Sequence, residues 1–192
     1  MAETLSTMLP LGTAMPPFAL PDAVSGRTLS QADVRGTKGT LVMFICNHCP
    51  FVQHVLPELA RLDRDYRGRG VGFAAINAND LAGYPQDGPP HMKELALAEG
   101  WGFPFLMDES QAVAQAYHAA CTPDFFLFDA NGALAYRGRL DETGPKAGVP
   151  PHGRDLRAAL DAVIAGHAPP AEQQPSVGCN IKWKEASVPR LS

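Results

Sequence analysis

Two cysteines separated by two residues lie between an apolar segment and a helix-like segment, and this junction constrains the fold more than any other feature. Residues 40–45 are apolar or β-branched and carry no charge, which is typical of a buried strand. Cys46, Cys49 and Pro50 follow at once, and Pro50 suits the first turn of a helix because its missing N–H has no partner to lose there. Apolar residues then recur at helical spacing. The sequence therefore predicts a strand that leads through a Cys-x-x-Cys turn into a helix.

This position has consequences for the chemistry of the two thiols. Unpaired backbone N–H groups and the positive end of the helix dipole stabilise a thiolate, which lowers the pKa of a thiol at a helix N-terminus. We expect Cys46 to be the low-pKa nucleophile, and the pair can close a small disulfide ring with Cys49. His48 lies between the two and can donate to the Cys46 thiolate, although an exposed histidine that only completes the turn fits equally well.

A Cys-x-x-Cys pair is also compatible with a metal ion. A structural zinc site normally needs a second pair of ligands at similar spacing, whereas Cys121 and Cys179 each stand alone. Redox chemistry is therefore the preferred interpretation, and no metal or other cofactor is expected. A copper-handling module is the alternative from a different class, because Cu(I) accepts two thiolates and an imidazole such as His48.

Length and composition limit the kinds of partner. The chain has 192 residues, enough for one domain, with 45% hydrophobic and 19% charged residues and a formal net charge of −4. Neither nucleic acid nor a membrane is an expected partner, because no basic run is interleaved with aromatics and no apolar run approaches the ~18 residues of a membrane span. Residues 1–17 lack the pattern of a secretory signal, so a cytoplasmic location is expected, where thiols stay reduced.

Strand-like and helix-like segments alternate along the chain. Strands are predicted at 40–45, 71–77, 103–107, 125–128 and 133–136, and helices at 50–67, 92–99, 110–119 and 155–165, with a short hairpin within 15–29. Such alternation predicts an α/β fold whose mixed central sheet is flanked by helices. Residues 1–168 are expected to form one domain, and residues 169–192 a polar C-terminal tail along the surface of the same domain.

Five motifs along the chain form a recognisable combination: Cys46–Val52, Ala75–Asn77, Cys121–Phe126, Tyr136–Asp141 and Pro175–Lys184. Together these motifs resemble the thioredoxin superfamily. The chain is most similar to the redoxin group, which gathers alkyl hydroperoxide reductases and thiol-specific antioxidants, and within it to a peroxiredoxin-like subgroup. The resemblance implies a thioredoxin-like α/β fold with an N-terminal β-hairpin extension.

The resemblance also implies roles for individual residues. Cys46 is the implied exposed nucleophile and Cys49 the implied buried resolving thiol. Thr122 and Pro123 form the implied cis-proline loop, whose backbone pairs with a bound peptide thiol in that family. The expected substrate-binding residues are therefore His48, Thr122 and Pro123.

Three functions remain at this point. The first is a thiol–disulfide oxidoreductase that acts on an oxidised protein or small-molecule thiol and is reset by a dithiol reductant such as a thioredoxin-type donor. The second is a thiol peroxidase, an antioxidant in which a hydroperoxide oxidises Cys46 to a sulfenic acid that Cys49 resolves. Met43 disfavours it, because peroxiredoxins carry threonine or serine three residues before the peroxidatic cysteine. The third is the copper-binding module.

Two further cysteines are candidate redox thiols. Cys179 lies in the polar tail just before Ile181 and Trp183, which alternate as in a short edge strand. Docking of that strand would hold the thiol on the domain, where it could accept the disulfide from Cys46 or pair with Cys121. The alternative is that Cys179 only packs beneath Trp183, as small buried cysteines often do.

Overall fold

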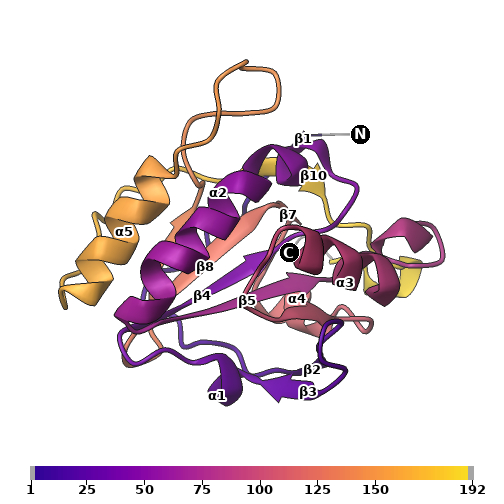
Figure 1. Cartoon of the computed structure of the whole chain (residues 1–192), viewed down its shortest axis with the longest axis horizontal. Helices are drawn as coiled ribbons and strands as arrows, with labels where there is room; N and C mark the ends of the chain where they lie inside the picture. The colour runs from indigo at the N-terminus through magenta and orange to yellow at the C-terminus, as the bar shows by residue number, and fades with distance from the viewer. Residues whose placement is uncertain (1–2, 190–192) are drawn as a thin grey trace.

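A mixed five-stranded sheet forms the centre of the computed structural model, which describes residues 3–189 (Figure 1). The strand order is β6–β5–β4–β8–β9. Three neighbouring strands run parallel, β8 runs antiparallel to β4, and β9 runs antiparallel to β8. The strands are β4 (Gly39–Phe44), β5 (Val71–Asn77), β6 (Phe105–Met107), β8 (Asp124–Asp129) and β9 (Leu134–Gly138). This arrangement confirms the predicted mixed α/β sheet.

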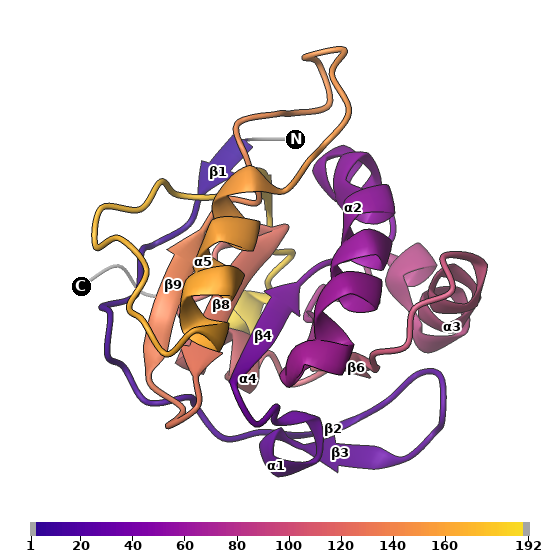
Figure 2. The same ribbon diagram turned by 60° about the vertical axis from the view of Figure 1, so that its left-hand side comes forward.

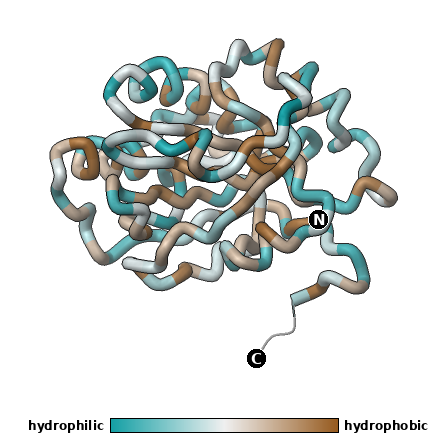
Figure 3. The backbone as a smooth tube through the Cα atoms, turned by 90° about the horizontal axis from the view of Figure 1, so that it is seen from below, coloured by the Kyte–Doolittle hydropathy of each residue, from teal (hydrophilic) through white to brown (hydrophobic). Residues whose placement is uncertain are grey.

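The central strand β4 is buried on both faces, as its uninterrupted apolar run predicts. Leu41 and Met43 point into one core cluster, whereas Val42 and Phe44 point into the other, because successive side chains of a strand face opposite sides. In Figure 3 the hydrophobic stretches, drawn in brown, run through the middle of the molecule, and the outer loops are mostly teal.

Helices cover both faces of the sheet. The first core cluster lies beneath α2 (Pro50–Tyr66), α3 (Pro89–Ala98) and α5 (Arg154–Ile164). The second lies beneath α1 (Gln31–Val34), α4 (Ala112–Ala116) and the antiparallel hairpin of β2 (Ala19–Pro21) and β3 (Thr28–Ser30). Figure 2 shows α2 and α5 over one face, with α1 and the hairpin at the lower edge. The predicted N-terminal hairpin is therefore present. No helix within residues 3–189 is both long and apolar enough to cross a bilayer.

The C-terminal tail departs from the expected surface course. Residues Val177–Asn180 form β10, the middle strand of a second, three-stranded sheet between β1 (Glu3–Leu5) and β7 (Cys121–Thr122). The predicted edge strand around Ile181 and Trp183 is therefore wrong: the strand comes earlier, with a partner on each side. These four residues pair with two segments that are far away in the sequence. A short segment by itself does not indicate such long-range pairing. Residues 190–192 of the predicted tail lie outside the described part.

Two predicted helices differ in their bounds. The helix expected at 110–119 is reduced to α4, because Gln111 has a φ of +65° and its side-chain amide donates to the carbonyls of Ala78 and Lys182. The helix expected at 92–99 begins earlier, at Pro89, and the loop between β5 and this helix contains a 3₁₀ turn, Pro85–Asp87. Backbone hydrogen bonding in this loop brings Asp87 into the interior.

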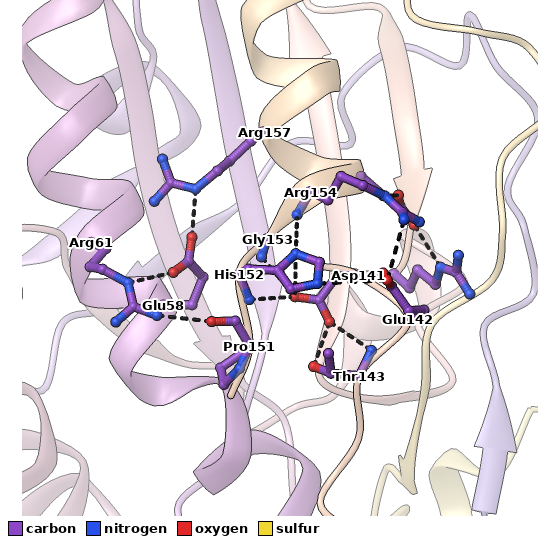
Figure 4. A network of polar contacts seen from close by, with 12 residues as sticks. Glu58, Arg61, Asp141, Glu142, Thr143, Pro151, His152, Gly153, Arg154 and Arg157 are labelled. Carbon is purple, nitrogen blue, oxygen red and sulfur yellow. Dashed lines mark hydrogen bonds and ion pairs between the residues drawn. The ribbon is translucent and has the colours of Figure 1, made fainter. Parts of the chain in front are cut away.

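A buried carboxylate joins α2 to α5 (Figure 4). Glu58 is 1% exposed and accepts hydrogen bonds from Arg61 and from Nε of Arg157, the latter at 2.6 Å. The first helical residue of α5 follows Gly153, whose φ is +67°, and a Cβ there would lie 2.7 Å from Oε1 of Glu58. Glycine is therefore required for this close approach.

A second buried carboxylate holds the loop that precedes α5 (Figure 4). Asp141 accepts the backbone N–H groups of Thr143, His152 and Gly153 and the hydroxyl of Thr143, at 2.6–2.8 Å. Although burial opposes ionisation, these hydrogen bonds lower the pKa of Asp141. The loop from 141 to 153 is thereby closed on itself beside the N-terminal half of α2.

Glu58→Ala is expected to lower the free energy of unfolding by about 3–5 kcal/mol, because it leaves two guanidinium groups without their buried counter-ion. Urea denaturation measures the loss. The control is Glu94→Ala on the exposed face of α3, which should change stability by less than about 0.5 kcal/mol. Equal effects of the two substitutions would show that the Glu58 network contributes nothing specific.

Candidate active site

The two cysteines of the Cys-x-x-Cys turn meet the cis-proline loop at one end of the central sheet. Cys46 follows β4, and Cys49 is the N-cap of α2. The Sγ atom of Cys49 lies 3.1 Å from the carbonyl oxygen of Thr122, and that of Cys46 lies 3.5 Å from the Thr122 hydroxyl. The Thr122–Pro123 peptide bond is cis, which confirms the expectation from the resemblance. All four cysteines lie within residues 3–189 and are free, buried thiols. Cys46 is only 1% exposed, so the exposed position that the resemblance implied for it is wrong.

Asp87 holds the turn between the two cysteines. Its side chain is fully buried, and Oδ1 accepts the backbone N–H groups of Asn47 at 2.9 Å and His48 at 3.2 Å. Its other oxygen, Oδ2, accepts Nδ1 of His48 at 2.6 Å and the side-chain amide of Asn79 at 2.8 Å. The amide of Asn77 binds the Asp87 backbone carbonyl at 2.6 Å. One carboxylate therefore carries four hydrogen bonds and positions the catalytic turn.

His48 is turned toward Asp87 and not toward the thiol. Its ring stacks on Tyr84 with centroids 5.0 Å apart, and its Nε2 has no hydrogen-bond partner within residues 3–189. The hydrogen bond to Cys46 that the sequence suggested is therefore wrong for this structure. The physical reason is the buried carboxylate of Asp87, which is the stronger acceptor for the imidazole.

The two neighbouring buried thiols interact electrostatically, and their pKa values separate. The interaction with the Cys46 thiol, together with the thiol of Cys179 and the backbone groups of Val52 and Cys179, outweighs burial and lowers the pKa of Cys49 to about 5. The interaction with Cys49, burial and the charge of Asp87 raise the pKa of Cys46. This direction is opposite to the sequence expectation that Cys46 is the low-pKa thiol, which stays a prediction. Cys49 is the N-cap residue of α2 and lies at the positive end of the helix dipole.

The tail strand β10 occupies the edge of the cis-proline loop. It pairs antiparallel with β7, with Cys179 opposite Thr122 and Asn180 opposite Cys121. The backbone of Thr122 that the resemblance assigned to a bound peptide is therefore already paired with this chain's own tail. Cys179 is 4% exposed and belongs to the core cluster that contains Cys46 and Cys49.

Sequence analysis missed several residues that the fold brings to the site. Asp87, Asn79 and Tyr84 all come from the loop after β5, whose length and glycine and proline content were the only sequence signal. Asp124 follows the cis-proline and is fully buried, which raises its pKa to about 8. Its Oδ1 has no partner within residues 3–189.

A cleft of about 360 Å³ opens beside the cis-proline loop. Its walls come from the start of α2, the cis-proline loop, the loop held by Asp141 and the segment leading into β10. The lining combines apolar and polar side chains, among them Phe51, His54, Pro123, Arg139, Glu142 and Val177, and it does not include Cys46 or Cys49.

The site also contains donor atoms suited to a metal ion. Ligand atoms of Cys46, His48 and Asp87 lie within 4.8 Å of one another. A metal bound to Asp87 would have to displace one or more of the four hydrogen bonds that its carboxylate accepts. Dithiol chemistry requires no such rearrangement.

The fold and the site together define a class, that of thioredoxin-fold proteins with a Cys-x-x-Cys dithiol facing a cis-proline. Residues 11–137 match the AhpC/TSA family, and the chain belongs to this family. The thiol–disulfide oxidoreductase ResA of Geobacillus thermodenitrificans is 30% identical over 133 residues, which are 68% of this chain and 70% of that protein. The ResA protein of Bacillus subtilis is 24% identical over 123 residues, 64% of each chain.

Two solved structures are similar over nearly the whole chain. An uncharacterized protein from Geobacillus kaustophilus is 51% identical with a TM-score of 0.94, covering 96% of this chain and 98% of that chain. A hypothetical protein from Sinorhizobium meliloti is 44% identical with a TM-score of 0.92, covering 95% and 99%. A thioredoxin-like protein solved in its oxidised form, 19% identical with a TM-score of 0.65, shares the fold; the match covers 83% of this chain and 99% of that one.

Proposed function

We propose that this protein is a thiol–disulfide oxidoreductase in which Cys46 and Cys49 cycle between dithiol and disulfide. The observation that carries the proposal is the pair of thiols at the start of α2, in which Cys46 lies 3.5 Å from the Thr122 hydroxyl and Cys49 lies 3.1 Å from the Thr122 carbonyl. In this pair the pKa of Cys49 is lowered to about 5. At neutral pH one sulfur of the pair is therefore ionised while the other keeps its proton. Membership of the AhpC/TSA family and similarity to ResA proteins support the same chemistry.

The first attack on a substrate is assigned to Cys46. The reduced pair holds one proton; in the reactive form this proton is on Cys49, whose thiol donates to the Thr122 carbonyl at 3.1 Å, and Cys46 is the thiolate. The Cys46 thiolate attacks one sulfur of the substrate disulfide, which forms a mixed disulfide and expels the other sulfur as a thiolate.

The second step releases the reduced product. Cys49 loses its proton and attacks the sulfur of Cys46, which breaks the mixed disulfide, closes the Cys46–Cys49 bond and frees the second substrate thiol. Overall, one substrate disulfide gains two electrons and two protons, and the protein dithiol loses them. A dithiol donor of thioredoxin type resets the pair by the same exchange in reverse.

A peroxidase is the second candidate, on two observations. The family groups alkyl hydroperoxide reductases with thiol-specific antioxidants. The hydroxyl of Thr122, 3.5 Å from the Cys46 sulfur, provides a hydroxyl near the thiol although Met43 occupies the position where peroxiredoxins have one. A sulfenic acid on Cys46 resolved by Cys49 is the corresponding reaction.

Parallel assays on the reduced protein test the proposal. We expect the protein to reduce a disulfide-bonded protein such as insulin while forming one Cys46–Cys49 disulfide per disulfide reduced, as peptide mapping measures. Cys46→Ser should abolish turnover. Rapid peroxide consumption without insulin reduction would favour the peroxidase instead. One equivalent of copper or zinc in the purified protein, lost on Cys46→Ser, would favour the metal-binding alternative.

A further inference from the structure

We infer that Cys179 is a third redox thiol, which takes the disulfide from the Cys46–Cys49 pair by bonding to Cys49. The inference rests on the proposed function, because the Cys46–Cys49 disulfide is the bond that Cys179 attacks. It concerns the tail strand β10, which lies beside β7 and β1 (Figure 1). The register of this strand, the direction of its side chains and the hydrogen bonds that hold the tail support the inference.

Close backbone approach places Cys179 at the dithiol. Cys179 is the direct antiparallel partner of Thr122, the residue that touches both catalytic sulfurs. The preceding Gly178 runs so near the cis-proline loop that a Cβ on it would lie 2.1 Å from the Thr122 carbonyl oxygen. Any side chain at residue 178 would therefore push β10 away from β7.

The direction of the side chains places Cys179 on the side of the Cys46–Cys49 pair and not with Cys121. Directly opposite residues of an antiparallel pair project to the same face, so Cys179 projects with the Thr122 side chain, whose hydroxyl lies at Cys46. Cys121 precedes Thr122 in the same strand and projects to the other face. Consistently, Cys46, Cys49 and Cys179 belong to one core cluster, whereas Cys121 does not.

Electrostatics also place Cys179 beside Cys49. The thiol and the backbone of Cys179 both lower the pKa of Cys49. Burial, followed by the interaction with Cys49, raises the pKa of Cys179 to about 12. Each thiol therefore shifts the pKa of the other, as neighbouring sulfurs do.

The tail is anchored by hydrogen bonds on both sides of Cys179. The thiol therefore stays near Cys49 and can react without a large movement of the tail. Before Cys179, the backbone N–H of Ser6 donates to the carbonyl of Ser176. After it, the N–H of Ile181 donates to the carbonyl of Ala120, and the N–H of Lys182 donates to the side chain of Asn79 at 2.9 Å. The thiol is thus held next to Cys49, which gives it a high effective concentration there.

The exchange balances without any further oxidant. Cys179 attacks the sulfur of Cys49 in the Cys46–Cys49 disulfide, and Cys46 leaves as a thiolate that takes the proton lost by Cys179. One disulfide is broken and one is formed, with no net change in electrons. The result is a Cys49–Cys179 disulfide and a free Cys46 thiol, which is again available to attack a substrate.

Cys46→Ser isolates the Cys49–Cys179 pair. The full-length variant is treated with one equivalent of diamide, a small oxidant that takes two electrons and two protons from a pair of thiols. We expect peptide mapping to find Cys49–Cys179 in at least about tenfold excess over Cys49–Cys121. The same product is expected in Cys46→Ser/Cys121→Ser. A Cys179 that stays alkylatable while Cys49 is oxidised would overturn the inference, as would a predominant Cys49–Cys121 bond.

A second variant tests the strand pairing itself. Gly178→Ala in the Cys46→Ser background should reduce the Cys49–Cys179 product about tenfold, because the added methyl group separates β10 from β7. An unchanged yield would show that the bond forms without the paired register, which contradicts the argument. The proposed function is judged separately, by insulin reduction and by the Cys46–Cys49 bond in Cys179→Ser, in which the disulfide cannot move to residue 179.

Discussion

Cys49→Ser is expected to remove the low-pKa thiolate and to slow disulfide exchange at neutral pH by about 10²–10⁴-fold. The reason is that the lowered pKa of the reduced pair lies on Cys49, and that Cys49 is the thiol that resolves the mixed disulfide. Ultraviolet absorbance of the thiolate against pH measures the first effect. The wild-type protein should titrate near pH 5, and this transition should be absent in Cys49→Ser. Cys121→Ser, which removes another buried thiol, should keep it.

The same pKa values determine how redox behaviour depends on pH. Above pH 5 the reduced pair has lost one proton, so reduction of the disulfide takes up two electrons and one proton. The reduction potential should then fall by about 30 mV per pH unit, against about 59 mV below pH 5, where two protons are taken up. Because the folded pKa of Cys49 lies below its unfolded value of about 8.5, this thiolate stabilises the reduced protein fully above pH 8.5. That contribution is lost as the pH falls through 5.

Reversal of the two cysteines is the outcome that would contradict this assignment. If Cys49→Ser retained a thiolate that titrates near pH 5 and Cys46→Ser lost it, the ionised sulfur would be on Cys46. A uniform slope of about 59 mV per pH unit between pH 5 and 8 would show that neither thiol is ionised in the reduced pair.

Asp87→Ala is expected to lower the free energy of unfolding by about 3–5 kcal/mol and to slow disulfide exchange by at least tenfold. The substitution leaves the buried donors of Asn47, His48 and Asn79 without their acceptor. It also releases the turn that holds Cys46 near Thr122, and small misplacements of reacting atoms are costly to rate. Urea denaturation and the insulin assay measure the two effects.

Asp87→Asn provides the matched comparison. It keeps the size of the side chain and one carbonyl acceptor, so it should lose less stability than Asp87→Ala. It also removes the negative charge beside Cys46, so the pKa of Cys46 should fall. A pKa of Cys46 that does not change in Asp87→Asn would mean that the carboxylate acts only as a structural anchor.

The fold was largely predictable because its signals are local. The apolar run of β4, the proline at the start of α2 and the Asn131-Gly132 turn are each read from a few adjacent residues, and all three elements are present. The helix around residues 110–119 was overestimated, because the side-chain hydrogen bonds of Gln111 to distant carbonyls override local propensity.

The sequence was sufficient to predict which sulfurs form the candidate site. It was not sufficient to predict the groups that surround them. The Cys46–Cys49 spacing and the Thr122–Pro123 motif indicated which segments meet, and the structure brings them together. The acceptor of the His48 ring could not be predicted, because Asp87 lies 39 residues away and is buried only once the loop after β5 has folded.

The sequence by itself determined the class of fold and the dithiol, because contiguous residues around Cys46 and Cys49 encode the strand, the turn and the helix. Only the tertiary structure decided which sulfur is ionised, because the amides and charges that set the two pKa values come from α2, Asp87 and the tail strand. It also decided the place of Cys179, since the pairing of β10 with β7 joins segments more than fifty residues apart. Hydrogen bonds between such segments form only in the folded chain.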